Sequence, residues 1–97
     1  MGLFSNMSDI GRINTLLKQI DPKISAILYE TQSPYPNVNR LKVESGSISV
    51  LMSEVMDIAC KAPNSVKLAP YYLMGRKMRL PEISAFLAEI VERCEQI

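Results

Sequence analysis

Apolar side chains recur every three or four positions through three long stretches of this 97-residue sequence. An α-helix turns once every 3.6 residues, so this spacing gathers such side chains along one face of a helix. The first stretch consists of Ile10, Ile13, Leu17, Ile20, Ile24 and Leu28. The pattern predicts helices that bury their apolar faces against one another, which makes an all-α fold the leading expectation.

The dipeptide Asp21-Pro22 interrupts the first stretch. Proline has no N–H to donate to the carbonyl of Lys18, and its ring crowds that turn of the helix. Either the helix kinks here, or it stops and Asp21 caps a second helix with Pro22 at its first position. The apolar spacing continues unchanged past the proline, which favours a kinked or tightly restarted helix.

The segment 33–37 contains two prolines and predicts a short, stiff connection. A second set of apolar residues at helical spacing follows and predicts a long helix that ends near Ala62. The set is Leu41, Ile48, Met52, Val55 and Ala59. Residues 41–52 also alternate apolar and polar around a Ser- and Gly-containing centre, so a short β-hairpin is the alternative there.

Small residues are frequent in the second stretch and, on a helix, would let a neighbouring helix approach closely. They are Ser45, Gly46, Ser47, Ser49 and Ser53. Met52 and Met56 lie one helical turn apart in the same stretch. Flexible thioethers at this spacing can line an adaptable peptide-binding groove, but they more often fill gaps in a core, which is the interpretation preferred here.

The last third of the chain divides at Pro81. Residues 64–80 mix proline, glycine, apolar and basic residues, which predicts one short helix around 66–74 or irregular structure. From Pro81 onward the sequence predicts a closing helix with one apolar seam, a candidate for self-association. This seam consists of Ile83, Leu87, Ile90, Cys94 and Ile97. Together the patterns predict one domain over 1–97, an all-α bundle of about four helices.

The composition excludes several chemistries. The sequence contains no histidine, which removes the usual general base and the commonest metal ligand. Its two cysteines, Cys60 and Cys94, have no C-x-x-C partner, and its four glycines form no phosphate-binding loop. We therefore expect no enzyme activity of its own, no metal site and no cofactor.

One segment has a distinctive charge. No acidic residue occurs between Asp57 and Glu82, although the whole chain carries a formal charge of only +1. Basic and aromatic side chains in this segment are candidates for contacting an anion or a nucleic acid, since phosphates pair with cations and bases stack on rings. The candidate residues are Lys67, Tyr71, Tyr72, Arg76, Lys77 and Arg79. The competing interpretation is that the segment neutralises the acidic closing helix, within the molecule or across a dimer.

These observations predict a small protein–protein interaction module, such as an adaptor, a chaperone or a regulatory subunit. A homodimer or a protein partner would cover its broad apolar seams. The alternative is a nucleic-acid-binding regulator that uses the basic segment 61–79. Two cysteines without a secretory leader favour the cytoplasm, and no apolar run approaches the length needed to span a membrane.

Overall fold

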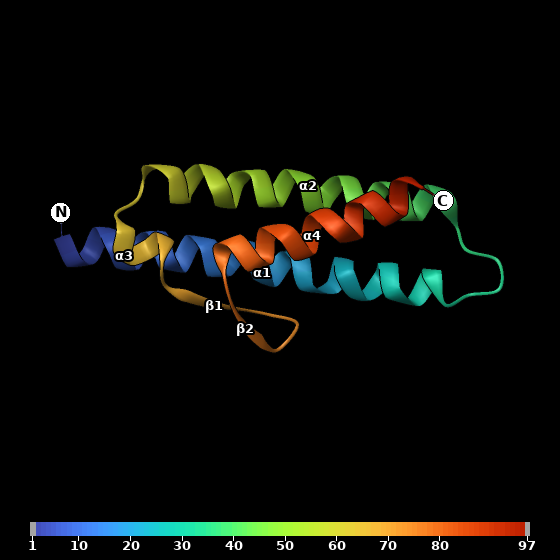
Figure 1. Cartoon of the computed structure of the whole chain (residues 1–97), viewed down its shortest axis with the longest axis horizontal. Helices are drawn as coiled ribbons and strands as arrows, with labels where there is room; N and C mark the ends of the chain where they lie inside the picture. The colour runs from blue at the N-terminus through green and yellow to red at the C-terminus, as the bar shows by residue number, and fades with distance from the viewer. Residues whose placement is uncertain (1, 97) are drawn as a thin grey trace.

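A computed structural model describes the backbone of residues 2–96 and the side chains of residues 8–96. The elements in order are α1 (Gly2–Thr31), α2 (Val38–Lys61), α3 (Asn64–Lys67), β1 (Pro70–Leu73), β2 (Arg76–Arg79) and α4 (Leu80–Glu95). Figure 1 shows α1 and α2 side by side, with α4 lying across them and the two strands projecting below α1. The molecule measures 51 × 21 × 17 Å, and the predicted mainly α-helical bundle is confirmed.

Helix α1 runs through Pro22 without ending there. The buried residues Leu17, Ile20, Ile24 and Ile27 lie on one face both before and after the proline, so core packing offsets a proline penalty of about 3 kcal/mol. Pro22 itself is on the exposed face. The expected stripe is corrected at its end, where Ile27 is buried and Leu28 is 47% exposed.

A buried carboxylate organises the turn between α1 and α2. Glu30 accepts a hydrogen bond from the backbone N–H of Asn37 at 2.9 Å and another from Arg40 Nη1 at 3.4 Å. Asn37 then caps α2, because its Oδ1 accepts the N–H of Arg40 at 3.1 Å. The proline-rich segment is thus the expected short connection, held at both ends by polar side chains.

Residues 41–52 are helical, so the alternative β-hairpin at this position is not formed. Leu41, Ser45, Ile48 and Met52 are buried on one face of α2 at steps of three or four residues, as helical packing against α1 and α4 requires. A β-hairpin does form later in the chain, where a helix around 66–74 was expected. That expectation was wrong beyond Lys67, because Tyr71 and Leu73 alternate with exposed residues and are buried as on one face of a strand.

The hairpin turn places a non-glycine residue, Met74, at positive φ. Strands β1 and β2 are antiparallel, with Tyr72 opposite Lys77 and Leu73 opposite Arg76. The two linking residues, Met74 (φ 54) and Gly75 (φ 74), both adopt positive φ, as a type I′ turn requires. The twist of this turn matches that of the two strands, which lets four-residue strands pair without a longer loop.

One hydrophobic core joins all the elements. It draws on one face of each long helix, on Val66 of α3 and on the inner face of the hairpin. Its largest fully buried side chains include Tyr71, Ile13, Leu17, Leu41, Ile83 and Leu87. Because α4 uses its apolar seam in this core, that seam does not lie open on the surface.

Candidate functional site

An apolar hollow lies between α2 and α4. It comprises two adjoining parts of about 400 and 590 Å³. Both parts are lined by Met56, Ser84 and Ala88, so they form one continuous depression, which we call the α2–α4 groove. The rest of its lining is mostly small or apolar. It includes Ser49, Met52, Ser53, Ala59, Cys60, Leu80, Pro81, Ala85, Leu87 and Val91.

The two ends of the α2–α4 groove carry opposite charges. Glu92 and Glu95 line the end beside Ser49, whereas Lys67 lines the end beside Cys60. None of these three side chains has an ion pair within residues 8–96. The groove is therefore negatively charged at one end and positively charged at the other, with an apolar centre at Met56 and Ala88.

Of the small residues of α2, Ser45 is buried, whereas the others leave the surface of the helix shallow. A Cβ placed on Gly46 would meet no atom within 4 Å, and Ser49 and Ser53 are exposed. The expected close approach of a neighbouring helix is therefore absent at Gly46, Ser49 and Ser53. Met52 and Met56 were both expected to fill gaps in the core. Met52 belongs to the core, whereas Met56 is 42% exposed in the groove.

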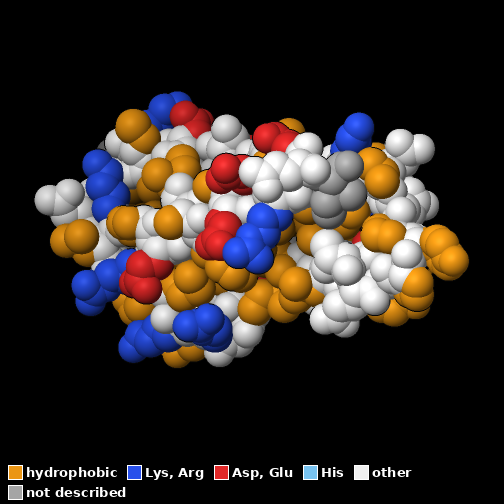
Figure 2. Space-filling view, turned by 45° about the vertical axis from the view of Figure 1, so that its right-hand side comes forward, with side chains coloured by type: hydrophobic (Ala, Val, Ile, Leu, Met, Phe, Trp, Pro, Cys, Tyr) orange, Lys and Arg blue, Asp and Glu red, His pale blue; other side chains and the backbone are white. Residues whose placement is uncertain are grey.

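The second candidate surface is the outer face of the hairpin. Alternation along the strands places Pro70, Tyr72, Lys77 and Arg79 on this face, and all four are exposed. Arg76 is also exposed, beside the turn, while Lys67 is half-buried at the edge of the groove. Figure 2 shows Lys and Arg side chains gathered at the lower left, on the lower side of the molecule from which the hairpin projects in Figure 1.

Tyr71 does not belong to this surface, although the sequence grouped it with Tyr72. Its side chain is only 1% exposed, and its hydroxyl donates a hydrogen bond to the carbonyl of Val66 at 2.7 Å. Burial, reinforced by the negative charge of Asp9, raises the pKa of this hydroxyl above its ordinary 10.0. Tyr71 thus anchors the hairpin to α3, whereas Tyr72 is 62% exposed.

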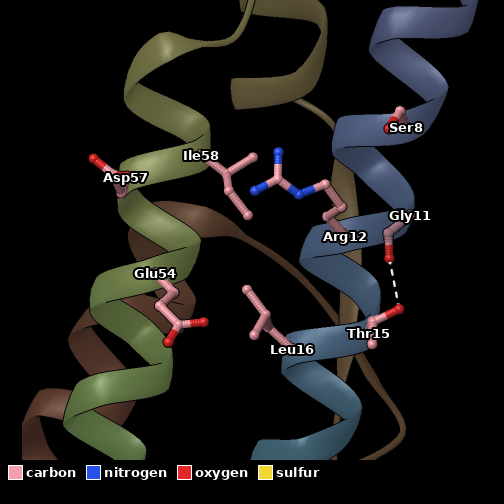
Figure 3. Close-up of a pocket in the computed structure, with 8 residues that line it drawn as sticks. All are labelled: Ser8, Gly11, Arg12, Thr15, Leu16, Glu54, Asp57 and Ile58. Carbon is pink, nitrogen blue, oxygen red and sulfur yellow. Dashed lines mark hydrogen bonds between the residues drawn. The ribbon is translucent and has the colours of Figure 1, made fainter.

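A third hollow, of about 650 Å³, lies between the N-terminal part of α1 and the C-terminal part of α2. Figure 3 shows Arg12 reaching from α1 toward Ile58, Glu54 directed toward Leu16, and Asp57 pointing away from α1. Arg12 pairs with Asp9 at 3.9 Å and Asp57 pairs with Lys61 at 3.5 Å, so each of these ion pairs lies within one helix. The hollow offers no nucleophile paired with a base, and we assign it no chemistry.

The predicted self-association seam is largely internal. Ile83, Leu87 and Cys94 are buried in the core and Ile90 is partly buried against it, while Ile97 lies outside the described residues. Burial raises the pKa of the Cys94 thiol above its ordinary value of 9.0, as for a packed, unreactive cysteine. Cys60 is exposed, and neither cysteine is in a disulfide.

Residues 8–96 contain no group of three or more side chains that could hold a metal ion, and no described helix is apolar over enough of its length to cross a membrane. No protein-family model matches the chain. No curated protein or solved structure matches it either.

The sequence patterns did not indicate the α2–α4 groove. Its lining alternates between two helices that are about 20 residues apart in the chain, and only their packing brings Met56 beside Ser84 and Ala88. The run of small residues in α2 was the one available signal. The charges of the hairpin face were visible in the sequence, but its β-hairpin structure was not expected there.

Proposed function

We propose that this chain is a non-catalytic protein-interaction module whose docking face is the α2–α4 groove, and that the groove docks a second copy of the same chain. The observation that supports this proposal is the continuous apolar depression with unpaired charges of opposite sign at its two ends. Such a depression gains stability when an apolar surface covers it, since burial removes that surface from water.

The charge pattern favours a second copy as the occupant. In a twofold-symmetric dimer, each copy presents the same face to the other. A twofold axis that passes near Ala88, perpendicular to the length of the groove, reverses the direction of the partner groove. Lys67 of one copy would then face Glu92 and Glu95 of the other at both ends, while the apolar centres meet. The result would be a four-helix arrangement made of α2 and α4 from each copy.

The dimensions of the groove predict the strength of this association. The α2 residues that line it run from Ile48 to Cys60, which is about 18 Å at the rise of an α-helix, and two helices side by side span about 20 Å. The buried surface would be a few hundred Å² per copy, below the ~800 Å² typical of stable complexes. We therefore propose a weak, reversible dimer, as suits an adaptor or regulatory subunit that exchanges partners.

We also propose the cytoplasm as the compartment. The two cysteines are unpaired, and Cys60 is exposed in the groove, where an oxidising environment would favour unwanted intermolecular disulfides.

Sedimentation velocity over a range of protein concentrations tests the docking face. Ala88 is exposed, so an Ala88→Arg variant should fold normally but place a bulky charge at the centre of the groove and abolish the dimer. Val50→Arg is the matched control, because Val50 is exposed on α2 but does not line the groove. Equal self-association of Ala88→Arg and wild-type protein would refute the proposal.

A charge exchange tests the orientation. Lys67→Glu should weaken the dimer roughly 3- to 10-fold, because it opposes like charges at both ends. Adding Glu92→Lys and Glu95→Lys to that variant should restore the affinity. If the triple variant remains as weak as Lys67→Glu, or if Lys67→Glu has no effect, the proposed antiparallel arrangement is wrong.

A further inference from the structure

The β1–β2 hairpin carries three cations that nothing in the described molecule neutralises, two of them on its outer face and Arg76 beside the turn. Arg76, Lys77 and Arg79 are exposed and make no ion pair within residues 8–96. By contrast, five of the eight basic residues elsewhere are paired with carboxylates at 2.7 to 3.9 Å. The hairpin thus differs from most of the surface in leaving its positive charges free for an external anion.

Two carboxylates lie close to the hairpin, but both contact its backbone. Asp21 accepts the N–H of Met74 at 2.9 Å, and Glu82 accepts the N–H of Arg79 at 3.3 Å. They hold the turn and the last residue of β2 rather than pairing with the cations. Even if both charges are subtracted, the three cations of the hairpin leave a local excess of positive charge.

The spacing of the cations on the outer face matches the spacing of phosphates in an extended nucleic-acid strand. Lys77 and Arg79 are two residues apart on one strand and point to the same side, about 7 Å apart along the strand. This distance is close to the spacing of successive phosphates in an extended nucleic-acid strand. Tyr72 lies directly opposite Lys77 on the neighbouring strand, so its ring is next to the cations on the same face.

The hairpin is also held rigidly. Tyr71 and Leu73 bury its inner face, and the hydrogen bonds of Tyr71 to Val66 and of Met74 to Asp21 attach it to α3 and α1. A surface fixed in this way loses little conformational entropy when it binds a ligand.

We infer that the outer face of the hairpin binds single-stranded nucleic acid, with Lys77 and Arg79 on successive phosphates and a base stacked on Tyr72, while Arg76 reaches a neighbouring phosphate from beside the turn. An exposed ring beside cations is how proteins bind single strands without sequence preference. A duplex hides its bases from such a ring. An anionic membrane would require more apolar residues on the same face as the cations than Pro70 and Tyr72.

Fluorescence anisotropy with a labelled oligothymidylate and a labelled oligouridylate tests this inference at a series of salt concentrations. Three phosphate contacts predict a slope of log K against log salt of about −2. A duplex of the same length should bind more weakly than the single strand. Absence of binding at low salt, or tighter binding to the duplex, would overturn the inference.

Four variants separate the roles of charge and ring. Tyr72→Ala should weaken binding roughly tenfold, whereas Tyr72→Phe keeps the ring and should bind as wild type. Lys77→Gln should weaken binding and reduce the salt slope by about 0.7. Lys42→Gln removes an exposed, unpaired charge far from the hairpin and should have little effect. Circular dichroism of each variant establishes that it is folded.

Two results would identify a different origin of the binding. If Lys42→Gln weakens binding as much as Lys77→Gln, the attraction depends on overall charge and the hairpin is not the site. If vesicles rich in phosphatidylserine bind the protein while both oligonucleotides do not, the cations serve a lipid surface. Either result contradicts the inference, and neither depends on whether the α2–α4 groove forms a dimer.

Discussion

The carboxylate of Asp21 accepts a hydrogen bond from the backbone N–H of Met74 at 2.9 Å, although the two residues are 53 positions apart. The bond connects the middle of α1 with the turn of the hairpin. It is formed at the one described non-glycine residue with positive φ. Asp21, which the sequence suggested as a helix cap before Pro22, instead fixes the turn that presents the basic face.

Replacing Asp21 with alanine should therefore loosen the hairpin. We expect the free energy of unfolding to fall by about 1 kcal/mol, since the bond is charge-assisted but solvent-accessible. Hydrogen exchange should accelerate at β1 and β2 more than at α2. Asp21→Asn retains an oxygen acceptor and should lose much less; equal losses in the two variants would contradict this role.

The turn conformation predicts opposite effects for two neighbouring substitutions. Met74→Asn should stabilise the protein by about 0.5 to 1 kcal/mol, because asparagine tolerates positive φ better than methionine. Gly75→Ala should destabilise it by about 1 kcal/mol through backbone strain alone, since a Cβ there would meet no atom within 4 Å. Thermal denaturation of both variants measures these changes.

Gly46 provides the control for the glycine substitution. It also has no atom within 4 Å of an added Cβ, but it lies in the middle of α2. Gly46→Ala should therefore raise the free energy of unfolding by about 0.5 to 1 kcal/mol. If Gly75→Ala and Gly46→Ala change stability in the same direction, the assigned turn conformation is wrong.

Glu30 should contribute strongly to stability through the α1–α2 turn. Its carboxylate is largely buried and serves both Asn37 and Arg40, so Glu30→Ala would leave the N–H of Asn37 without that acceptor. We expect a loss of about 1 to 3 kcal/mol in urea denaturation. Glu54→Ala, which removes an exposed carboxylate of α2, should change stability by less than about 0.5 kcal/mol.

Stability should decline in alkaline solution. The pKa values of Tyr71 and Cys94 are both raised by burial, so the folded state keeps protons that the unfolded state releases. Their contribution is complete below the unfolded pKa values of 9.0 and 10.0 and is lost as pH rises through the higher folded values. Denaturation at several pH values should show this loss beginning near pH 9. In Tyr71→Phe, the part of the loss above pH 10 should be smaller.

The helices were predictable because the residues that they bury recur at helical spacing in the sequence. Ile13, Leu17 and Ile20 repeat at helical spacing, and the same burial explains why α1 continues past Pro22. The hairpin was not predictable in the same way. Its strands have only four residues each, and Met74-Gly75 is not one of the common type I′ dipeptides.

The candidate surfaces were predictable only in part. The charges of Lys77 and Arg79 are visible in the sequence, but the separation of Tyr72 from Tyr71 depends on strand alternation, and therefore on the hairpin. The α2–α4 groove depends on how two helices pack, which apolar spacing does not specify. The same packing buries Leu87 and Cys94, so the seam expected to mediate self-association faces inward.

Disulfide trapping at the centre of the α2–α4 groove tests the proposed docking face most directly. In a Cys60→Ser background, Cys94 is buried, so a cysteine introduced by Ala88→Cys is the reactive thiol among the described residues. Residues near a twofold axis approach their own copies, so mild oxidation of Ala88→Cys should yield a covalent dimer, whereas Val50→Cys should remain largely monomeric. Cross-linking of Val50→Cys as readily as Ala88→Cys, or no cross-linking of Ala88→Cys, would contradict the account.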